Sequence, residues 1–173
     1  MPDARADLLD RIVAEVAAGG LGDRSLRDIA SAIGSSHRML LYHFGSRAGL
    51  VAAIVDSVES AQRDLLRELA ASADDARSLV TALWDRVSSP ELRPFVRLFF
   101  EAVATTAGAG DRVTGPWLED ARQAGAQVGA GLDPTEVRLG VAVVRGLLVD
   151  VLVSGDAGPA TEALRRFADR WYT

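Results

Sequence analysis

Helical periodicity, interrupted at short intervals by glycine, proline and capping residues, runs through almost the whole chain and limits its fold more than any other feature. Apolar residues recur three and four positions apart, whereas the strict alternation of a half-buried β-strand is nearly absent. Gly19 and Gly20 end the first apolar run, Gly34 ends the second, and Ser89 with Pro90 opens a later one. The pattern therefore predicts an all-α protein.

The composition is that of a folded chain with a sizeable core. The 173 residues are 49% hydrophobic and 25% charged, and they include no cysteine. The two histidines, His37 and His43, both belong to the first 50 residues. Thiol chemistry and disulfides are thereby excluded, as are most histidine-based metal sites and catalytic triads. We expect neither a cofactor nor a metal, and we do not expect an enzyme.

No segment of the sequence is typical of secretion or of membrane insertion. The first residues lack a basic region followed by an apolar one. The longest apolar stretch, residues 139–153, is interrupted by Arg145 and Asp150. We therefore expect a cytoplasmic protein without a membrane partner.

Two short predicted helices near the N-terminus are joined by a tight turn. Ser25 begins the first helix as its N-cap, Asp28 supplies the acid of a capping box, and Gly34 ends the helix. Ser36 begins the second helix, which runs to about Phe44. Two short helices joined in this way are typical of a helix-turn-helix, whose second helix enters the major groove of DNA.

The distribution of charge favours DNA contact at this end of the chain. The net charge of −5 taken alone argues against a nucleic-acid partner. Residues 1–50, however, hold six arginines and six acids, and no acid occurs between Ile29 and Val55. An acid-free second helix that carries Arg38 on a neutral module suits a contact with guanine bases.

The candidate DNA-binding residues are of two kinds. Side chains on the outward face of the second helix can reach base edges, because Leu40 and Phe44 take the inward face. Hydroxyls and cations at or next to helix starts can hold phosphates. The complete set is Ser25, Arg27, Ser36, His37, Arg38, Leu41, Tyr42, His43 and Arg47.

This region resembles the signature of the TetR family. The resemblance rests on residues 25–30 (SLRDIA), 34–36 (GSS) and 40–47 (LLYHFGSR), and it covers about residues 8–55 at the family's spacing. It implies a homodimer that binds operator DNA, blocks transcription and is released by a small molecule. At the position of Arg47, the basic residue of the family holds a phosphate.

Three positions depart from the family pattern. Leu41 stands where a tyrosine is usual, Met39 where a threonine is common, and Arg38 where a glycine or proline is common. We therefore expect an operator that differs from those of better-matched members.

Five aromatic residues of the C-terminal part are candidate ligand contacts. Core packing explains any one of them more simply, but the adjacent Phe99 and Phe100 cannot share one helix face. One of these two is therefore expected to line a cavity or an interface. The candidates are Trp84, Phe95, Phe99, Phe100 and Trp117.

The stretch 139–153 is apolar on almost every side, which predicts burial on two faces. We expect this helix to form a dimer interface together with the last helix, and the alternative is one fully enclosed core helix. The candidate interface residues are Gly140, Val144, Leu148 and Leu152.

These observations predict two domains. A helix-turn-helix DNA-binding domain would span residues 1–46, and a helical ligand-binding and dimerisation domain would span residues 47–173. The predicted function is that of a homodimeric transcriptional repressor, released from a palindromic operator by an unknown small molecule. The alternatives are a DNA-binding protein without a sensor, constitutive or architectural, and an all-α enzyme.

Overall fold

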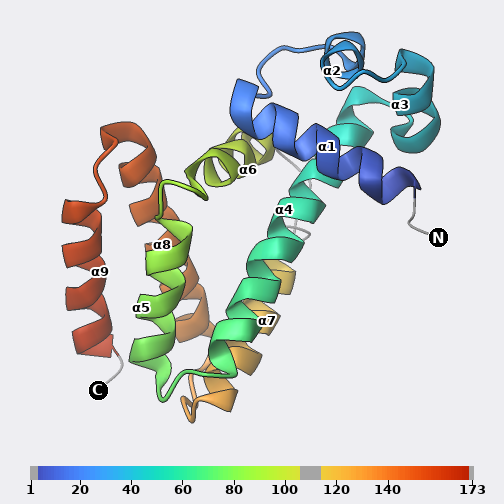
Figure 1. Cartoon of the computed structure of the whole chain (residues 1–173). Coiled ribbons are helices and arrows are strands. Elements are labelled where there is room, and N and C mark those ends of the chain that lie inside the picture. The colour runs from blue at the N-terminus through green and yellow to red at the C-terminus, as the bar shows by residue number, and fades with distance from the viewer. Residues whose placement is uncertain (1–3, 106–113, 172–173) are drawn as a thin grey trace. The chain divides into compact units, whose positions relative to one another are not determined.

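The computed structural model describes residues 4–105 and 114–171, and over these residues it contains nine helices and no strand (Figure 1). The helices are α1 (Ala4–Gly19), α2 (Leu26–Ala32), α3 (His37–Phe44), α4 (Arg47–Ala70), α5 (Ala76–Val87), α6 (Arg93–Thr105), α7 (Gly115–Gln127), α8 (Pro134–Ser154) and α9 (Gly158–Trp171). The prediction of an all-α fold is confirmed.

The chain divides into two compact units. The first unit combines residues 1–60 with residues 94–110, and the second combines residues 61–93 with residues 111–173. In this division the first half of α4 and nearly all of α6 belong with the N-terminal helices. The predicted domain boundary at residue 46 stays a prediction. The three N-terminal helices, two of which have only seven and eight residues, have too little surface to enclose a core of their own.

The core of the first unit forms between helices that are distant in sequence. α1 packs against α2, and α2 packs against α3. Ile12 of α1, Ile29 of α2, Leu40 of α3 and Ile54 of α4 are fully buried. The helices α2 and α3 have only seven and eight residues, so their stability depends on this burial rather than on helix propensity.

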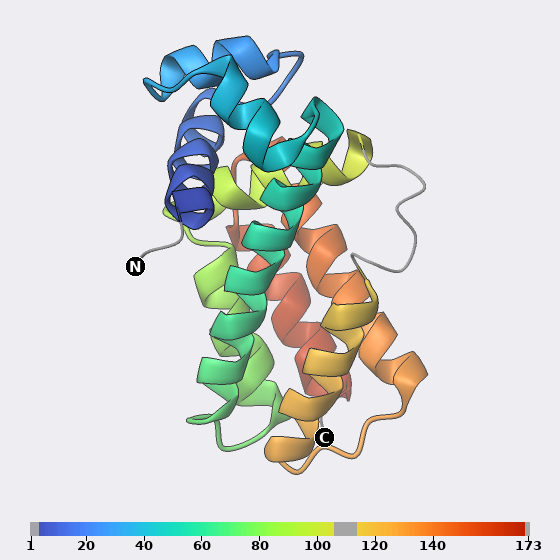
Figure 2. The ribbon, with the colours of Figure 1, turned by 90° about the vertical axis from the view of Figure 1, so that its right-hand side faces the viewer.

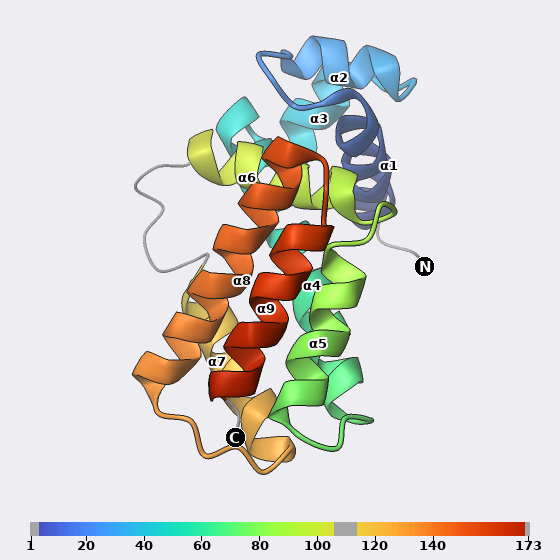
Figure 3. The same cartoon turned by 90° about the vertical axis from the view of Figure 1, so that its left-hand side faces the viewer.

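The second unit is a bundle in which α9 lies between α5 and α8 (Figure 3). α7 packs along α8. The end of α4 lies beside α7 (Figure 2), where Arg63 pairs with Asp120 at 3.3 Å. Among the helices of the described residues, none combines the length and the apolar character that a membrane crossing would need.

One helix start differs from that expected, and another is set by a side-chain contact. Residues 88–92 form turns, and α6 begins at Arg93 instead of Pro90, with the Arg93 amide bonded to the Ser89 carbonyl at 3.1 Å. α9 begins at Gly158, whose amide donates to the Asp156 carboxylate at 2.8 Å. In both places a side chain or carbonyl two to four residues earlier satisfies an amide of the first turn, which fixes the start.

Three helices begin with a capping box, at Ser25, Asp75 and Asp133. In the third, hydrogen bonds from the backbone amides of Glu136 and Thr135 hold the pKa of Asp133 below its ordinary value of 3.8. The ionised carboxylate therefore stabilises the start of α8, both as an acceptor and through the helix dipole.

We expect Asp133→Asn to lower the thermal unfolding temperature at neutral pH, because asparagine keeps the acceptor but loses the charge. The advantage of the wild-type chain should be complete above about pH 4 and should disappear as the pH falls through the lowered pKa of Asp133. Calorimetry of both proteins between pH 6 and pH 2 measures this difference. A difference that stays constant across the whole range would contradict it.

Candidate nucleic-acid interface

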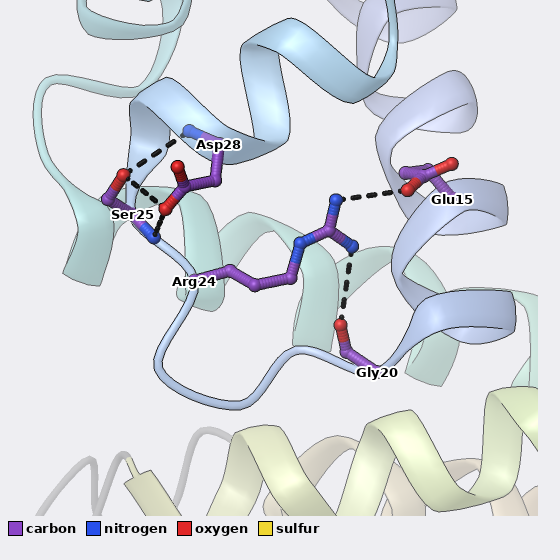
Figure 4. A network of polar contacts seen from close by, with 5 residues as sticks. All are labelled: Glu15, Gly20, Arg24, Ser25 and Asp28. Atoms are coloured by element: carbon purple, nitrogen blue, oxygen red, sulfur yellow. Dashed lines mark hydrogen bonds and ion pairs between the residues drawn. The ribbon is translucent and has the colours of Figure 1, made fainter.

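The two serines of the predicted set cap the helices of the helix-turn-helix. The Ser25 hydroxyl accepts from the Asp28 amide at 3.2 Å and donates to the Asp28 carboxylate at 2.6 Å (Figure 4). The bonds from the side chain and the backbone of Ser25 hold the pKa of Asp28 below its ordinary range. Ser36 accepts from the Met39 amide at 3.2 Å. Both serines are exposed, and Arg27 is exposed in the first turn of α2.

The outward face of α3 carries a cation, two apolar side chains and a phenol. Arg38 and Met39 are exposed, Leu41 is 40% exposed and Tyr42 is 81% exposed. These groups match the donors and apolar surfaces that read base edges in a major groove. Met39 was absent from the predicted set, although its position three residues before Tyr42 on the helix indicates the shared face.

The two histidines lie at opposite ends of α3 and are half-buried. The His43 ring meets the Tyr42 ring edge-on, with centroids 4.9 Å apart. Tyr42 thus has one flank supported and its remaining surface exposed. Within the residues that the structure describes, no three ligand-type side chains gather into a metal site.

Two arginines of α1, which sequence reasoning did not single out, hold the ends of the short helices. The Arg5 guanidinium lies 5.3 Å from the centre of the Phe44 ring and donates to the His43 carbonyl at 3.5 Å. Arg11 donates to the carbonyl of Ile33. Cations at the C-terminal ends of α2 and α3 are favourable for the helix dipole, so α1 fixes both helices from the same side.

Arg47, which the sequence predicts to hold a phosphate, contacts the loop before α2. Its Nε donates to the Arg24 carbonyl at 3.0 Å and its Nη2 donates to the Gly22 carbonyl at 2.5 Å. The side chain is half-buried against the loop before α2. Its position at the start of α4 predicted a phosphate contact, which stays a prediction. The sequence carries no signal for the loop contact.

The candidate ligand residues fall into both compact units. Trp84 and Trp117 belong to the second unit, and Phe95, Phe99 and Phe100 belong to the first. Phe99 is buried and Phe100 is half-buried, and their rings meet edge-on with centroids 5.2 Å apart. Phe95 is half-buried, and Trp117 is buried.

Trp84 is a core residue of the second unit. Its side chain is 1% exposed, and its Nε1 donates to the Thr161 hydroxyl at 2.8 Å. This hydrogen bond connects α5 to α9, two helices that pack together. The indole is therefore satisfied within its own unit, as expected of a buried tryptophan.

The candidate dimer residues lie on the less exposed sides of α8. Leu148 is buried, and Gly140, Val144 and Leu152 are half-buried. Leu148 therefore packs inside its own unit. A different set of small and apolar residues is exposed on this helix: Leu139, Ala142, Gly146, Val149 and Val153.

The first unit contains a helix-turn-helix whose second helix, α3, has no acid and exposes Arg38 and Tyr42. These features are typical of helix-turn-helix DNA-binding proteins. Residues 8–54 match the family described as "Bacterial regulatory proteins, tetR family". This segment is therefore similar to the DNA-binding part of TetR-family regulators.

Solved structures share the fold along the whole chain. A protein of Rhodococcus sp. assigned to the TetR-family regulators is 24% identical, with a TM-score of 0.76 and 98% of both chains covered. The multidrug binding protein EbrR, solved with ethidium, is 22% identical, with a TM-score of 0.71 over 96% of this chain and 99% of that chain. SmeT, the repressor of the Stenotrophomonas maltophilia multidrug efflux pump SmeDEF, is 19% identical, with a TM-score of 0.70 over 99% of this chain and 91% of that chain. No curated protein sequence matches the chain.

We expect Trp84→Phe to lower the free energy of unfolding by about 1–3 kcal/mol, because it leaves the Thr161 hydroxyl without its donor and opens a small cavity. Chemical denaturation measures the decrease. Thr161→Val is the matched variant, and the double variant should be destabilised by less than the sum of the two single effects. Additive effects would show that the hydrogen bond does not stabilise the unit.

Proposed function

We propose that the protein is a homodimeric transcriptional repressor that binds a palindromic operator through α3 and is released by a small-molecule ligand. The observation that supports this proposal best is the outward face of α3, where Arg38, Leu41 and Tyr42 stand exposed in an acid-free stretch. A regulator of the TetR family acts on chromosomal DNA, so we also propose that the protein works in the cytoplasm.

DNA recognition would combine base reading with phosphate contacts. Arg38 can fork onto O6 and N7 of a guanine, and Leu41 can contact a thymine methyl. Tyr42 and Arg27, both exposed, can hold phosphates on either side. Two copies of α3 separated by about 34–36 Å would meet successive major grooves, which requires a two-fold symmetric dimer and a palindromic site.

The exposed stripe on α8 supports the proposed dimer. Its members, at positions 139, 142, 146, 149 and 153, follow one another at alternating steps of three and four residues, the repeat of a helix that packs along another helix. Val153 is 83% exposed, and a side chain added at Gly146 would meet no neighbouring atom. A second copy of the helix can approach closely over Ala142 and Gly146.

Ligand release is supported by the aromatic residues and by two of the fold relatives. EbrR binds ethidium, and SmeT represses a multidrug efflux pump. We propose an apolar or aromatic effector for this chain, with the half-buried Phe95 and Phe100 among its contacts. Compounds that raise the unfolding temperature would then be titrated against free and DNA-bound protein.

Thermodynamic reciprocity gives the criterion for such an effector. A compound that weakens DNA binding must bind the free dimer more tightly than the DNA-bound dimer by the same factor, typically about 5–150-fold. Equal affinity for both forms would exclude the compound as the effector. If a broad library of apolar and aromatic compounds yields no ligand, the protein regulates without a sensor.

We expect Arg38→Ala to change which DNA sequence is preferred. Without the forked hydrogen bonds to guanine, about 1–3 kcal/mol of discrimination should disappear at one position of each half-site. Selection from a random duplex pool, carried out with wild type and variant, measures this change. Arg27→Ala is the matched control, and it should weaken binding about equally on all sequences. An unchanged consensus for Arg38→Ala would make Arg38 a backbone contact.

We expect Val149→Glu to convert the dimer into a folded monomer, because the new carboxylate would be desolvated in the proposed interface. Light scattering gives the mass, and circular dichroism shows whether the helices persist. Ala126→Glu places the same charge on an exposed position of α7 and should leave the dimer intact. A Val149→Glu protein that remains dimeric would place the interface elsewhere.

A further inference from the structure

The loop between α1 and α2, residues 20–25, is held by side chains from three helices. Within the loop and α1, Arg24 bonds to the Glu15 carboxylate at 3.0 Å and to the Gly20 carbonyl at 3.5 Å (Figure 4). Gly20 and Gly22 adopt positive φ angles of 77° and 41°, so the loop follows a path that most residues disfavour. Such a loop is held in one conformation by the groups around it.

Arg47 holds the loop from α4. The guanidinium spans the carbonyls of Gly22 and Arg24, two residues apart, with different nitrogen atoms. This use depends on the planar fork of arginine, and a lysine ammonium cannot reproduce it with the same geometry. The interaction therefore differs from phosphate binding, which a compact cation also performs well.

Glu101 holds the same loop from α6. Its Oε2 accepts from the Leu21 amide at 3.2 Å, across 80 positions of sequence. The Leu21 side chain is buried, and its amide would lose a partner if the carboxylate were removed. Both residues belong to the first compact unit, so this hydrogen bond lies within one packed body.

We propose that Arg47 and Glu101 are positioning residues for DNA binding. They fix the loop before α2 and thereby the orientation of the helix-turn-helix, and neither acts by touching DNA. The loop ends at Ser25, the N-cap of α2, and α2 carries α3. A loop that is released changes the orientation of α2 and lowers the fraction of protein in which α3 fits the groove. This inference rests on the proposed DNA-binding function.

Charge and geometry predict opposite effects at Glu101. Removing an acid from a DNA-binding protein should strengthen binding by electrostatics alone. If Glu101 instead holds the loop, Glu101→Ala should weaken binding about tenfold, whereas Glu101→Gln should bind at least as well as wild type. Glutamine keeps an oxygen acceptor for the Leu21 amide and lacks the negative charge.

At Arg47 the charge-conserving change separates the two roles. Arg47→Lys should weaken binding about tenfold while the slope of log affinity against log salt stays at the wild-type value. If Arg47 held a phosphate, Arg47→Lys would keep its affinity, and Arg47→Ala would make the slope shallower by about 0.9 for each phosphate left without its cation. Arg122→Lys, on an exposed face of α7, is the matched control and should bind as wild type.

The experiment uses the full chain and the duplex that the wild-type protein selects from a random pool, with affinities measured at several salt concentrations. Hydrogen exchange of the protein without DNA is the second measurement. The Leu21 amide should exchange faster in Glu101→Ala and at the wild-type rate in Glu101→Gln. If the wild-type protein selects no duplex, the proposed function fails. The exchange rate of the Leu21 amide still tests whether Glu101 stabilises the loop.

The proposal is overturned by either of two results. One is stronger DNA binding by both Glu101 variants together with unchanged exchange of the Leu21 amide. The other is wild-type affinity of Arg47→Lys combined with a shallower salt slope of Arg47→Ala. Weaker binding by Glu101→Ala and Arg47→Lys at an unchanged slope supports it.

Discussion

Burial of two helices that are too short to be stable alone is the constraint on which the N-terminal unit depends. α2 and α3 together contain only 15 residues, and each buries two large apolar side chains. Ile29 and Leu40 are fully buried, as are Ile12 of α1 and Ile54 of α4 in the same unit. With the inward faces so occupied, the outward face of α3 is left to carry Arg38 and Tyr42 without a structural task.

Hydrogen bonds to backbone carbonyls fix the rotation of the helices, which apolar packing alone does not determine. Arg5, Arg11 and Arg47 each donate to a carbonyl at a helix end or in a loop. Apolar contacts are non-directional, so they hold helices together without fixing their rotation. The forked guanidinium adds direction, and in this chain every basic residue is an arginine. The proposed reading of DNA needs that precision, since a small rotation of α3 would move its side chains away from the base edges.

The sequence was sufficient to predict most helices, but it did not predict which distant residues contact one another. The capping residues Ser25 and Ser36 predicted two helix starts correctly, because a cap is a local interaction between neighbours in sequence. Ser89 and Pro90 did not predict the start of α6, because residues 88–92 form turns and the helix begins at Arg93. The roles of Arg47 and Glu101 could not be predicted, since their partners lie 23 to 80 positions away. On α8 the apolar character was evident, but only packing shows which side remains exposed.

The membership of α6 in the N-terminal unit determines where this chain can be divided and recombined. A junction between residues 46 and 47 leaves the helix-turn-helix without the buried Leu50 and Ile54 of α4, and without Leu98 and Glu101 of α6. In a hybrid protein made at that junction, α2 and α3 would pack against helices of a different parent. The exchangeable module is discontinuous in sequence, so a functional transplant carries residues 1–60 and α6 from the same parent.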